Sequence, residues 1–180
     1  GIHKSTDNGR TWTELRSGLP QADMGKIGLA VTPADPNLVY ATIESDPANK
    51  GFYRSKDKGE SWEKRNSYTS GGTGPHYYQE IEASPTNADV VVQMDVFYQV
   101  TRDGGATFNY LETGRSKHSD NHALWIDPTN TEHMLAARMA GYKGLLMRGR
   151  LRSEERRVGE GWRIRWAPEP LKKKKKKNTY

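Results

Sequence analysis

Carboxylates, tyrosines and histidines gather in three short segments of this chain. The first contains His76, Tyr77, Tyr78 and Glu80, the second ends in Asp95, and the third contains His118, Asp120 and His122. Glycoside hydrolysis needs two carboxylates on either side of the scissile bond, and a sugar-binding face needs aromatic rings. We therefore take Glu80, Asp95 and Asp120 as candidate catalytic residues, and His76, Tyr77, Tyr78, His118 and His122 as candidate ligand-binding residues.

Two other interpretations of these side chains stay open. The polar groups can simply bond one another and the loop backbone, which is the common fate of polar clusters without a known motif. Alternatively, His118, Asp120 and His122 alternate, so they point the same way in an extended chain. Two histidines and a carboxylate are an adequate ligand set for zinc. Nothing else in the sequence supports a metal, so we expect neither a metal nor a cofactor.

The elements that must position these residues come from an internal repeat. An eight-residue segment spans residues 5–12, 55–62 and 101–108 and reads S/T-x-D-x-G-x-T/S-W/F each time. The copies begin 50 and 46 residues apart. Self-similarity at such a period is the mark of a repeat architecture. We call this segment the turn box.

The residue types of the turn box predict a hairpin turn. Asp and Ser or Thr can bond the local backbone, Gly can adopt a positive φ, and the aromatic residue is expected to fold over the turn and pack in the sheet. We therefore expect its carboxylates to be structural rather than catalytic. The structural positions are Ser5, Asp7, Gly9 and Trp12 in the first box, Ser55, Asp57, Gly59 and Trp62 in the second, and Thr101, Asp103, Gly105 and Phe108 in the third.

Short apolar runs separated by turn residues lie between the boxes. One complete unit reads as strands over residues 27–31, 38–43, 51–54 and 62–65, and the next units follow the same order. Four short strands on a period of this size predict a β-propeller blade, whereas a β-sandwich would not repeat the same turn. We expect an all-β fold: a partial β-propeller of about three and a half four-stranded blades with three turn-box hairpins.

The repeat also divides the chain. Residues 1–136 are expected to form an incomplete β-propeller. A fourth box is due near residues 144–150 but is missing, so we interpret residues 137–149 as disrupted by a reading-frame error. Residues 150–180 resemble translated sequencing-adapter read-through followed by a poly-A run, and we expect this basic tail to be artefactual or disordered.

Charge and composition narrow the function classes. The 180 residues carry a formal charge of +6, but residues 150–180 hold 12 of the 28 basic residues and only 4 of the 22 acidic ones. The remaining 149 residues therefore hold 16 basic and 18 acidic groups, and we expect no nucleic-acid partner. No run of 18 apolar residues exists, which argues against a membrane span. The absence of cysteine excludes thiol catalysis.

The turn boxes resemble the Asp-box or BNR repeats of sialidases, xyloglucanase-type glycoside hydrolases and sortilin-type propellers. The segments 51–55, 74–81 and 118–128 are also similar to bacterial proteins with a sortilin N-terminal-like propeller, which are usually labelled glycosyl hydrolase or YVTN-repeat proteins. The resemblance covers about residues 1–135. It implies a propeller fold, a carbohydrate or peptide ligand, and a secreted or periplasmic location.

The propeller expectation places the candidate site. In a propeller the loops that enter the first strand of each blade lie on the face opposite the turn boxes, and here those loops are residues 21–26, 67–78 and 112–122. The candidate residues therefore fall on this face. A sialidase is less favoured, because Arg10, Arg54 and Arg102 lie in or beside boxes rather than at that face.

Two function classes follow from this reasoning. The chain is either a fragment of a carbohydrate-active, glycosyl hydrolase-like propeller or a fragment of a non-enzymatic, sortilin-type propeller that binds peptide or protein ligands. Opposed acids across the channel would favour the first class, and an apolar channel wall would favour the second.

Overall fold

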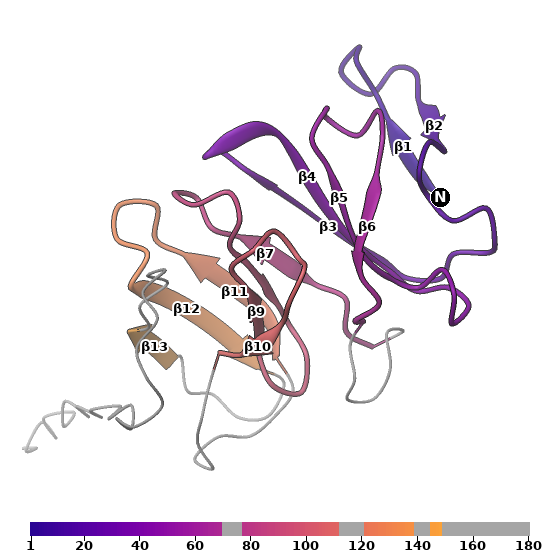
Figure 1. Cartoon of the computed structure of the whole chain (residues 1–180). Coiled ribbons are helices and arrows are strands. Elements are labelled where there is room, and N and C mark those ends of the chain that lie inside the picture. Colours follow the sequence, from indigo (N-terminus) through magenta and orange to yellow (C-terminus); the bar gives the residue numbers. More distant parts are fainter. Residues whose placement is uncertain (70–76, 112–120, 139–144, 149–180) are drawn as a thin grey trace, which may run out of the picture.

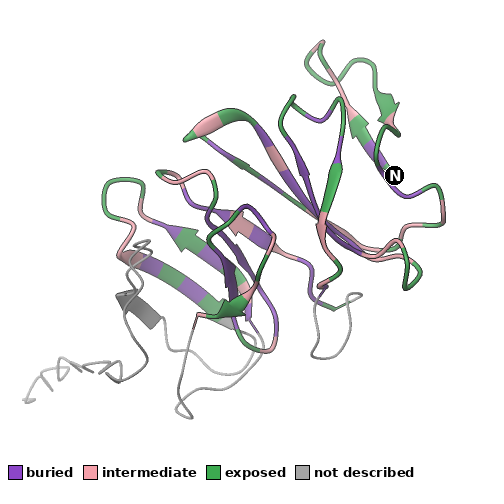
Figure 2. Cartoon of the chain, viewed as in Figure 1, coloured by how far each residue is buried: buried purple, intermediate pink, exposed green. Residues whose placement is uncertain are grey.

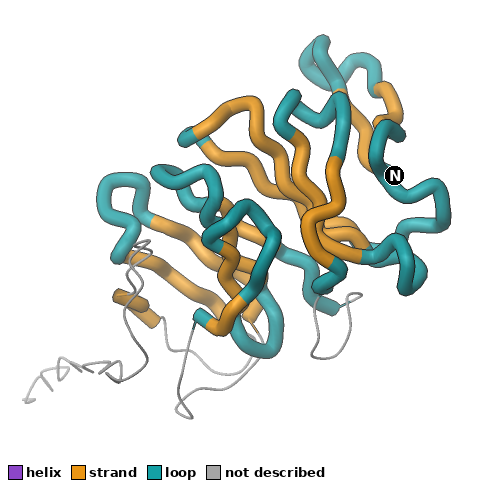
Figure 3. Tube along the Cα trace, in the orientation of Figure 1, coloured by secondary structure: helices purple, strands orange, loops and turns teal. Residues whose placement is uncertain are grey.

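The computed structural model describes residues 1–69, 77–111, 121–138 and 145–148 of the chain. This part is built from strands and loops, with no helix (Figure 3). The strands are β1 Ile2–Lys4, β2 Thr13–Leu15, β3 Ile27–Thr32, β4 Asp35–Ile43, β5 Gly51–Ser55, β6 Glu63–Asn66, β7 Ile81–Ala83, β8 Val91–Gln93, β9 Gln99–Thr101, β10 Asn109–Tyr110, β11 Asn121–Ile126, β12 His133–Arg138 and β13 Leu145–Arg148.

The strands form four antiparallel sheets in chain order. Strands β1–β2 make a two-stranded sheet, β3–β6 and β7–β10 make four-stranded sheets, and β11–β13 make a three-stranded sheet. Within each sheet, consecutive strands are hydrogen-bonded neighbours, and successive sheets lie beside one another (Figure 1). This arrangement confirms the predicted all-β, partial β-propeller.

Each turn box forms the hairpin between the last two strands of its sheet. In the second box the Ser55 hydroxyl accepts a hydrogen bond from Gly59 N at 2.7 Å, and Asp57 Oδ1 accepts one from Ser61 N at 2.8 Å. Lys58 and Gly59 both have positive φ, 59° and 91°, which explains the glycine. The same bonds recur in the other boxes.

The hydrogen bonds in the boxes change the acidity of their carboxyls. The backbone bond from Thr11 lowers the pKa of Asp7 to about 2, and the Ser61 hydroxyl lowers that of Asp57 to about 2. Burial raises the pKa of Asp103, but hydrogen bonds from Thr107 and Thr101 outweigh it and lower the pKa. The turn carboxylates are thus engaged in hydrogen bonds while they remain at the surface.

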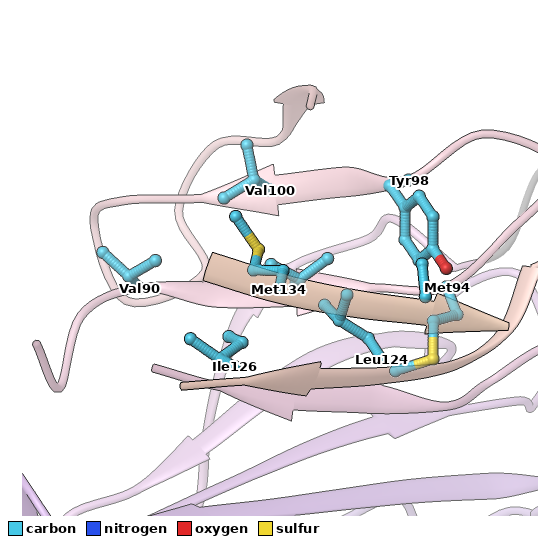
Figure 4. Packing of buried hydrophobic residues seen from close by; sticks show 9 residues of the cluster. Val90, Met94, Tyr98, Val100, Leu124, Ile126 and Met134 are labelled. Carbon is cyan, nitrogen blue, oxygen red and sulfur yellow. The ribbon is translucent and has the colours of Figure 1, made fainter. Parts of the chain in front are cut away.

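The hydrophobic core lies between sheets rather than inside any one of them. Figure 4 shows Val90, Met94, Tyr98 and Val100 of the β7–β10 sheet facing Leu124, Ile126 and Met134 of the next sheet. Alternate residues of β12 are buried and exposed, as Figure 2 shows, because successive side chains of a strand point to opposite faces. Each sheet is therefore stabilised mainly by its neighbours.

The aromatic residues that end the turn boxes differ in how far the neighbouring sheets bury them. Trp62 is 6% exposed and packs with Ile2, Leu19 and Tyr53 in the cluster between the first two sheets. Phe108 contacts the preceding sheet through Phe52, with ring centroids 5.1 Å apart. Trp12 was expected to pack in its sheet, and this expectation is wrong: it is 62% exposed and belongs to none of the buried clusters of the described residues.

The first strands of neighbouring sheets approach one another closely. A Cβ added at Gly28 of β3 would lie 1.6 Å from the carbonyl oxygen of Gln79, which lies two residues before the start of β7. Thr42 Oγ1 also donates to Gln79 Oε1 at 2.6 Å across the same boundary. Glycine at position 28 therefore lets the segment before β7 lie directly against β3.

Two of the expected chain divisions lie largely outside the described residues. Of residues 137–149, the structure describes 137–138 in β12 and 145–148 as β13, which pairs with β12. The frame-error hypothesis and the nature of residues 150–180 stay predictions. Among the described residues, no helix has the length and apolar character needed to cross a membrane.

Candidate functional site

The segment that enters β7 carries an aromatic cluster. Tyr78 stacks on His122 with ring centroids 5.2 Å apart and an interplanar angle of 15°. Tyr77 meets both rings edge-on, at 5.1 Å from Tyr78 and 5.2 Å from His122. Tyr78 is buried and Tyr77 is 37% exposed, so the cluster has an anchored base and an accessible ring. We call Tyr77, Tyr78 and His122 the aromatic cluster.

A lysine from the neighbouring sheet holds Glu80 beside this cluster. Lys26 Nζ lies 2.9 Å from Glu80 Oε1 and donates to the Tyr77 carbonyl oxygen at 3.1 Å. Burial raises the pKa of Glu80, but hydrogen bonds from Lys26 and the backbone outweigh burial and lower the pKa. Glu80 is therefore an ionised and partly exposed carboxylate.

Asp95 lies at the same edge of the β7–β8 pair but in a different setting. Met94 N donates to the Glu80 carbonyl oxygen at 2.9 Å, which places these two strand ends together. The Asp95 carboxylate accepts hydrogen bonds from Tyr68 Oη at 2.8 Å and from Val96 N at 2.6 Å, and the residue is only 3% exposed. These contacts suit a structural carboxylate that fixes the loop.

Asn121 connects Asp95 to the next sheet. Its Nδ2 donates to the carbonyl oxygens of Asp95 at 2.8 Å and of Val96 at 3.0 Å. Asn121 directly precedes His122 in β11, so this bond also places His122 against the tyrosines. Lys26, the β7 segment and His122 thus come from three successive sheets and meet at one end of β7.

This end of β7 is opposite the turn boxes. Ile81 of β7 and Gln99 of β9 both pair with Gln93, while Ala83 and Thr101 both pair with Val91. The turn box follows Thr101, whereas the aromatic cluster lies before Ile81. The register therefore places the turn box and the aromatic cluster at opposite ends of the sheet, as the sequence predicted.

The structure brings together five of the eight candidate residues from the sequence. Glu80, Asp95, Tyr77, Tyr78 and His122 lie at the same edge, whereas His76, His118 and Asp120 fall outside the described residues. Among the described residues, no group of three or more His, Asp or Glu side chains could hold a metal ion. The possible ligand set His118, Asp120 and His122 is therefore not tested.

Sequence reasoning missed three side chains near this edge. Lys26 and Tyr68 contact the candidate carboxylates from loops that show no motif. Glu82 lies within β7, where burial raises the pKa of its carboxyl, and within the described residues this carboxyl has no hydrogen-bond or ion-pair partner. The position of Glu82 two residues after Glu80, at the spacing of side chains on one face of a strand, was the available signal for Glu82.

The interior behind this edge is polar. Gln79, Gln93 and Asn121 are buried amides, and each keeps at least one side-chain nitrogen or oxygen without a hydrogen-bond partner in the described part of the chain. Such groups are rare in protein interiors and cost stability. Their presence shows that this end of the interface is not optimised for apolar packing.

Comparison with known proteins shows the fold. The structure is similar to a GH74 enzyme from Niastella koreensis, with a TM-score of 0.53 and 15% identity over 68% of this chain and 21% of the enzyme. It is also similar to the GH74 xyloglucanase from Xanthomonas campestris, with a TM-score of 0.53 and 17% identity over 76% of this chain and 24% of the enzyme. The chain thus spans about a quarter or less of those proteins.

No family model matches the sequence, and no curated protein matches it either. At these identities the likeness to GH74 structures shows the fold alone. The chain is therefore a partial β-propeller with the architecture seen in glycoside hydrolases.

Proposed function

We propose that this chain forms part of the carbohydrate-binding face of a glycoside hydrolase-like β-propeller. The resemblance of the turn boxes to Asp-box repeats supports it, as does the similarity of the fold to a GH74 enzyme and a GH74 xyloglucanase. One observation carries the proposal: the aromatic cluster and the ionised Glu80 lie together at the end of β7 opposite the boxes.

The chemistry of this edge suits a sugar. The exposed ring of Tyr77 offers an apolar face to the C–H groups of a pyranose, while Glu80 and Lys26 offer an acceptor and a donor to its hydroxyls. A site that combines a few placed polar groups with aromatic walls is typical of small-molecule recognition. A peptide-binding role of the sortilin type is favoured by no contact described above.

Glu80 is the favoured candidate for a catalytic carboxylate. Asp95 is buried and bonded, so its replacement is expected to disturb the loop rather than a chemical step. A hydrolase needs a second carboxylate across the scissile bond, and Asp120 stays a candidate from the sequence. A secreted or periplasmic location stays part of the proposal, since extracellular polysaccharides are accessible there.

Binding to soluble polysaccharides tests the proposal. Affinity electrophoresis of the full chain in gels that contain xyloglucan, mixed-linkage β-glucan or hydroxyethyl cellulose should show retardation in at least one gel. Tyr77→Ala should abolish the retardation, whereas Trp12→Ala, an exposed aromatic at the opposite end of its sheet, should not. Equal migration of the wild type in all gels and in a polysaccharide-free gel would overturn the proposal.

A further inference from the structure

A second aromatic pair lies exposed at the same end of the β7–β10 sheet. Phe97 and Tyr110 meet edge to face, with ring centroids 6.0 Å apart and an interplanar angle of 87°. Phe97 is 48% exposed and Tyr110 is 63% exposed. Two large aromatic rings in contact with one another and with solvent form an apolar surface that core packing does not explain.

The sheet fixes this pair in place. Tyr110 is the register partner of Gln99, and Leu111 N donates to the Tyr98 carbonyl oxygen at 2.9 Å. Tyr98 itself is fully buried, whereas Phe97, in the bend directly before it, is exposed and contacts Tyr110. The pair is therefore held beside the sheet by the pairing of Tyr110 and by the burial of Tyr98.

The pair is also linked to the aromatic cluster. Phe97 directly follows Val96, and His122 directly follows Asn121, while Asn121 Nδ2 donates to the Val96 carbonyl oxygen at 3.0 Å. The two aromatic groups thus lie on either side of one hydrogen bond between neighbouring sheets. The segment between them contains Asp95 and Asn121, which are both buried, and Val96, which is partly exposed.

We propose that Phe97 and Tyr110 form a second stacking site for the same polysaccharide chain that binds the aromatic cluster. This inference rests on the proposed function and specifies its ligand: a glycan long enough to bridge both aromatic groups. Two exposed aromatic groups, with the partly exposed Lys26 and Glu80 beside one of them, suit a polysaccharide, whose sugar units present both C–H faces and hydroxyls. A protein interface would instead be expected to have a continuous apolar centre.

Comparing long and short ligands tests this inference. Titration calorimetry with the polysaccharide that retards the wild type, and with an oligosaccharide of one repeat unit from it, should be run on four forms of the full chain. These are the wild type, Tyr110→Ala, the double variant Phe97→Ala/Tyr110→Ala, and Trp12→Ala. Trp12 is the matched control because it is 62% exposed, almost the same as Tyr110.

We expect the double variant to bind the polysaccharide about tenfold more weakly and the oligosaccharide unchanged, since only the long ligand gains from a second linked contact. Tyr110→Ala should give a smaller loss in the same direction, and Trp12→Ala should give none. If the double variant binds the polysaccharide as the wild type does, while Tyr77→Ala abolishes retardation in the gels described above, this inference alone would be overturned. A wild type that binds neither ligand would overturn the proposed function as well.

Size-exclusion chromatography tests the remaining alternative, in which another protein chain covers Phe97 and Tyr110. If the exposed pair is a contact between protein chains, the double variant should elute later than the wild type, and the stacking-site inference would be wrong. Equal elution of the two forms, together with the selective loss of polysaccharide binding, supports it.

Discussion

Trp62 and Trp12 occupy the same position of the same turn box, yet one is 6% exposed and the other 62%. Their local structure agrees closely: each indole Nε1 donates to the carbonyl oxygen of the box glycine, at 2.9 Å for Trp62 and 3.1 Å for Trp12. Trp62 packs against the preceding sheet, which supplies Ile2 and Leu15, whereas Trp12 packs in no buried cluster of the described residues. The box therefore fixes the hairpin, and the neighbouring sheet decides whether its aromatic ring contributes to the core.

The largest expected difference is in stability. Trp62→Ala should lower the free energy of unfolding by about 3–5 kcal/mol, because a buried ring leaves a cavity between the first two sheets. Trp12→Ala should cost about 1 kcal/mol or less, through the lost indole hydrogen bond. Urea denaturation followed by fluorescence and circular dichroism measures both, and equal losses would contradict the comparison.

The first strands offer the same contrast on a smaller scale. Ile81 and Leu29 each lie three residues before a Ser-Pro or Thr-Pro turn, but Ile81 is buried against the preceding sheet and Leu29 is exposed. Ile81→Ala is expected to cost about 2–5 kcal/mol. Leu29→Ala should cost about 0.5 kcal/mol or less. A loss for Leu29→Ala as large as that for Ile81→Ala would show that the exposed strand face is already covered in solution.

The carboxyls of the first two boxes, Asp7 and Asp57, should contribute to stability with the same dependence on pH. The folded pKa of Asp57 and of Asp7 is about 2, below the ordinary 3.8. The stabilisation from each carboxylate is therefore present above pH 3.8 and lost as the pH falls towards 2. Asp57→Asn and Asp7→Asn should flatten the fall of the melting temperature across that range by similar amounts. An effect at Asp57 alone would mean that the hairpin chemistry also depends on burial.

The contribution of Glu82 to stability should depend on pH in the opposite direction. Burial raises its folded pKa above the ordinary 4.5, so its contribution to stability is full below pH 4.5 and is lost as the pH rises through the folded pKa. Glu82→Gln should therefore raise the melting temperature at pH 8 by about 2 °C and leave it unchanged at pH 4. Glu132→Gln, at a partly exposed turn between β11 and β12, is the control.

Deletion of residues 150–180 should have the smallest effect. The tail has no repeat and no apolar pattern, so its removal should change the melting temperature by less than about 1 °C. Calorimetry of the truncated and complete chains measures this. A fall of several degrees would assign the tail a packing partner.

Much of the fold could be predicted from the sequence because the turn boxes are local structures. The spacing of Ser55, Asp57 and Gly59 specifies the hairpin through bonds within a few residues, and the apolar runs between boxes specify the strands. The face that carries the site followed from strand direction alone. For Asp95 the sequence could not decide between catalysis and structure, because its partner Tyr68 is distant in the chain.

The repeat, its four-strand order, and the acidic and aromatic residues before each first strand can be recognised in the amino-acid sequence alone. The assembled sheets reveal which box tryptophan is buried, that Lys26 and His122 contact Tyr77 from two different sheets, and that burial raises the pKa of Glu82. Bonds of a turn close within eight residues and can be seen in a motif. Contacts between sheets join residues about fifty positions apart, so they depend on how the sheets assemble.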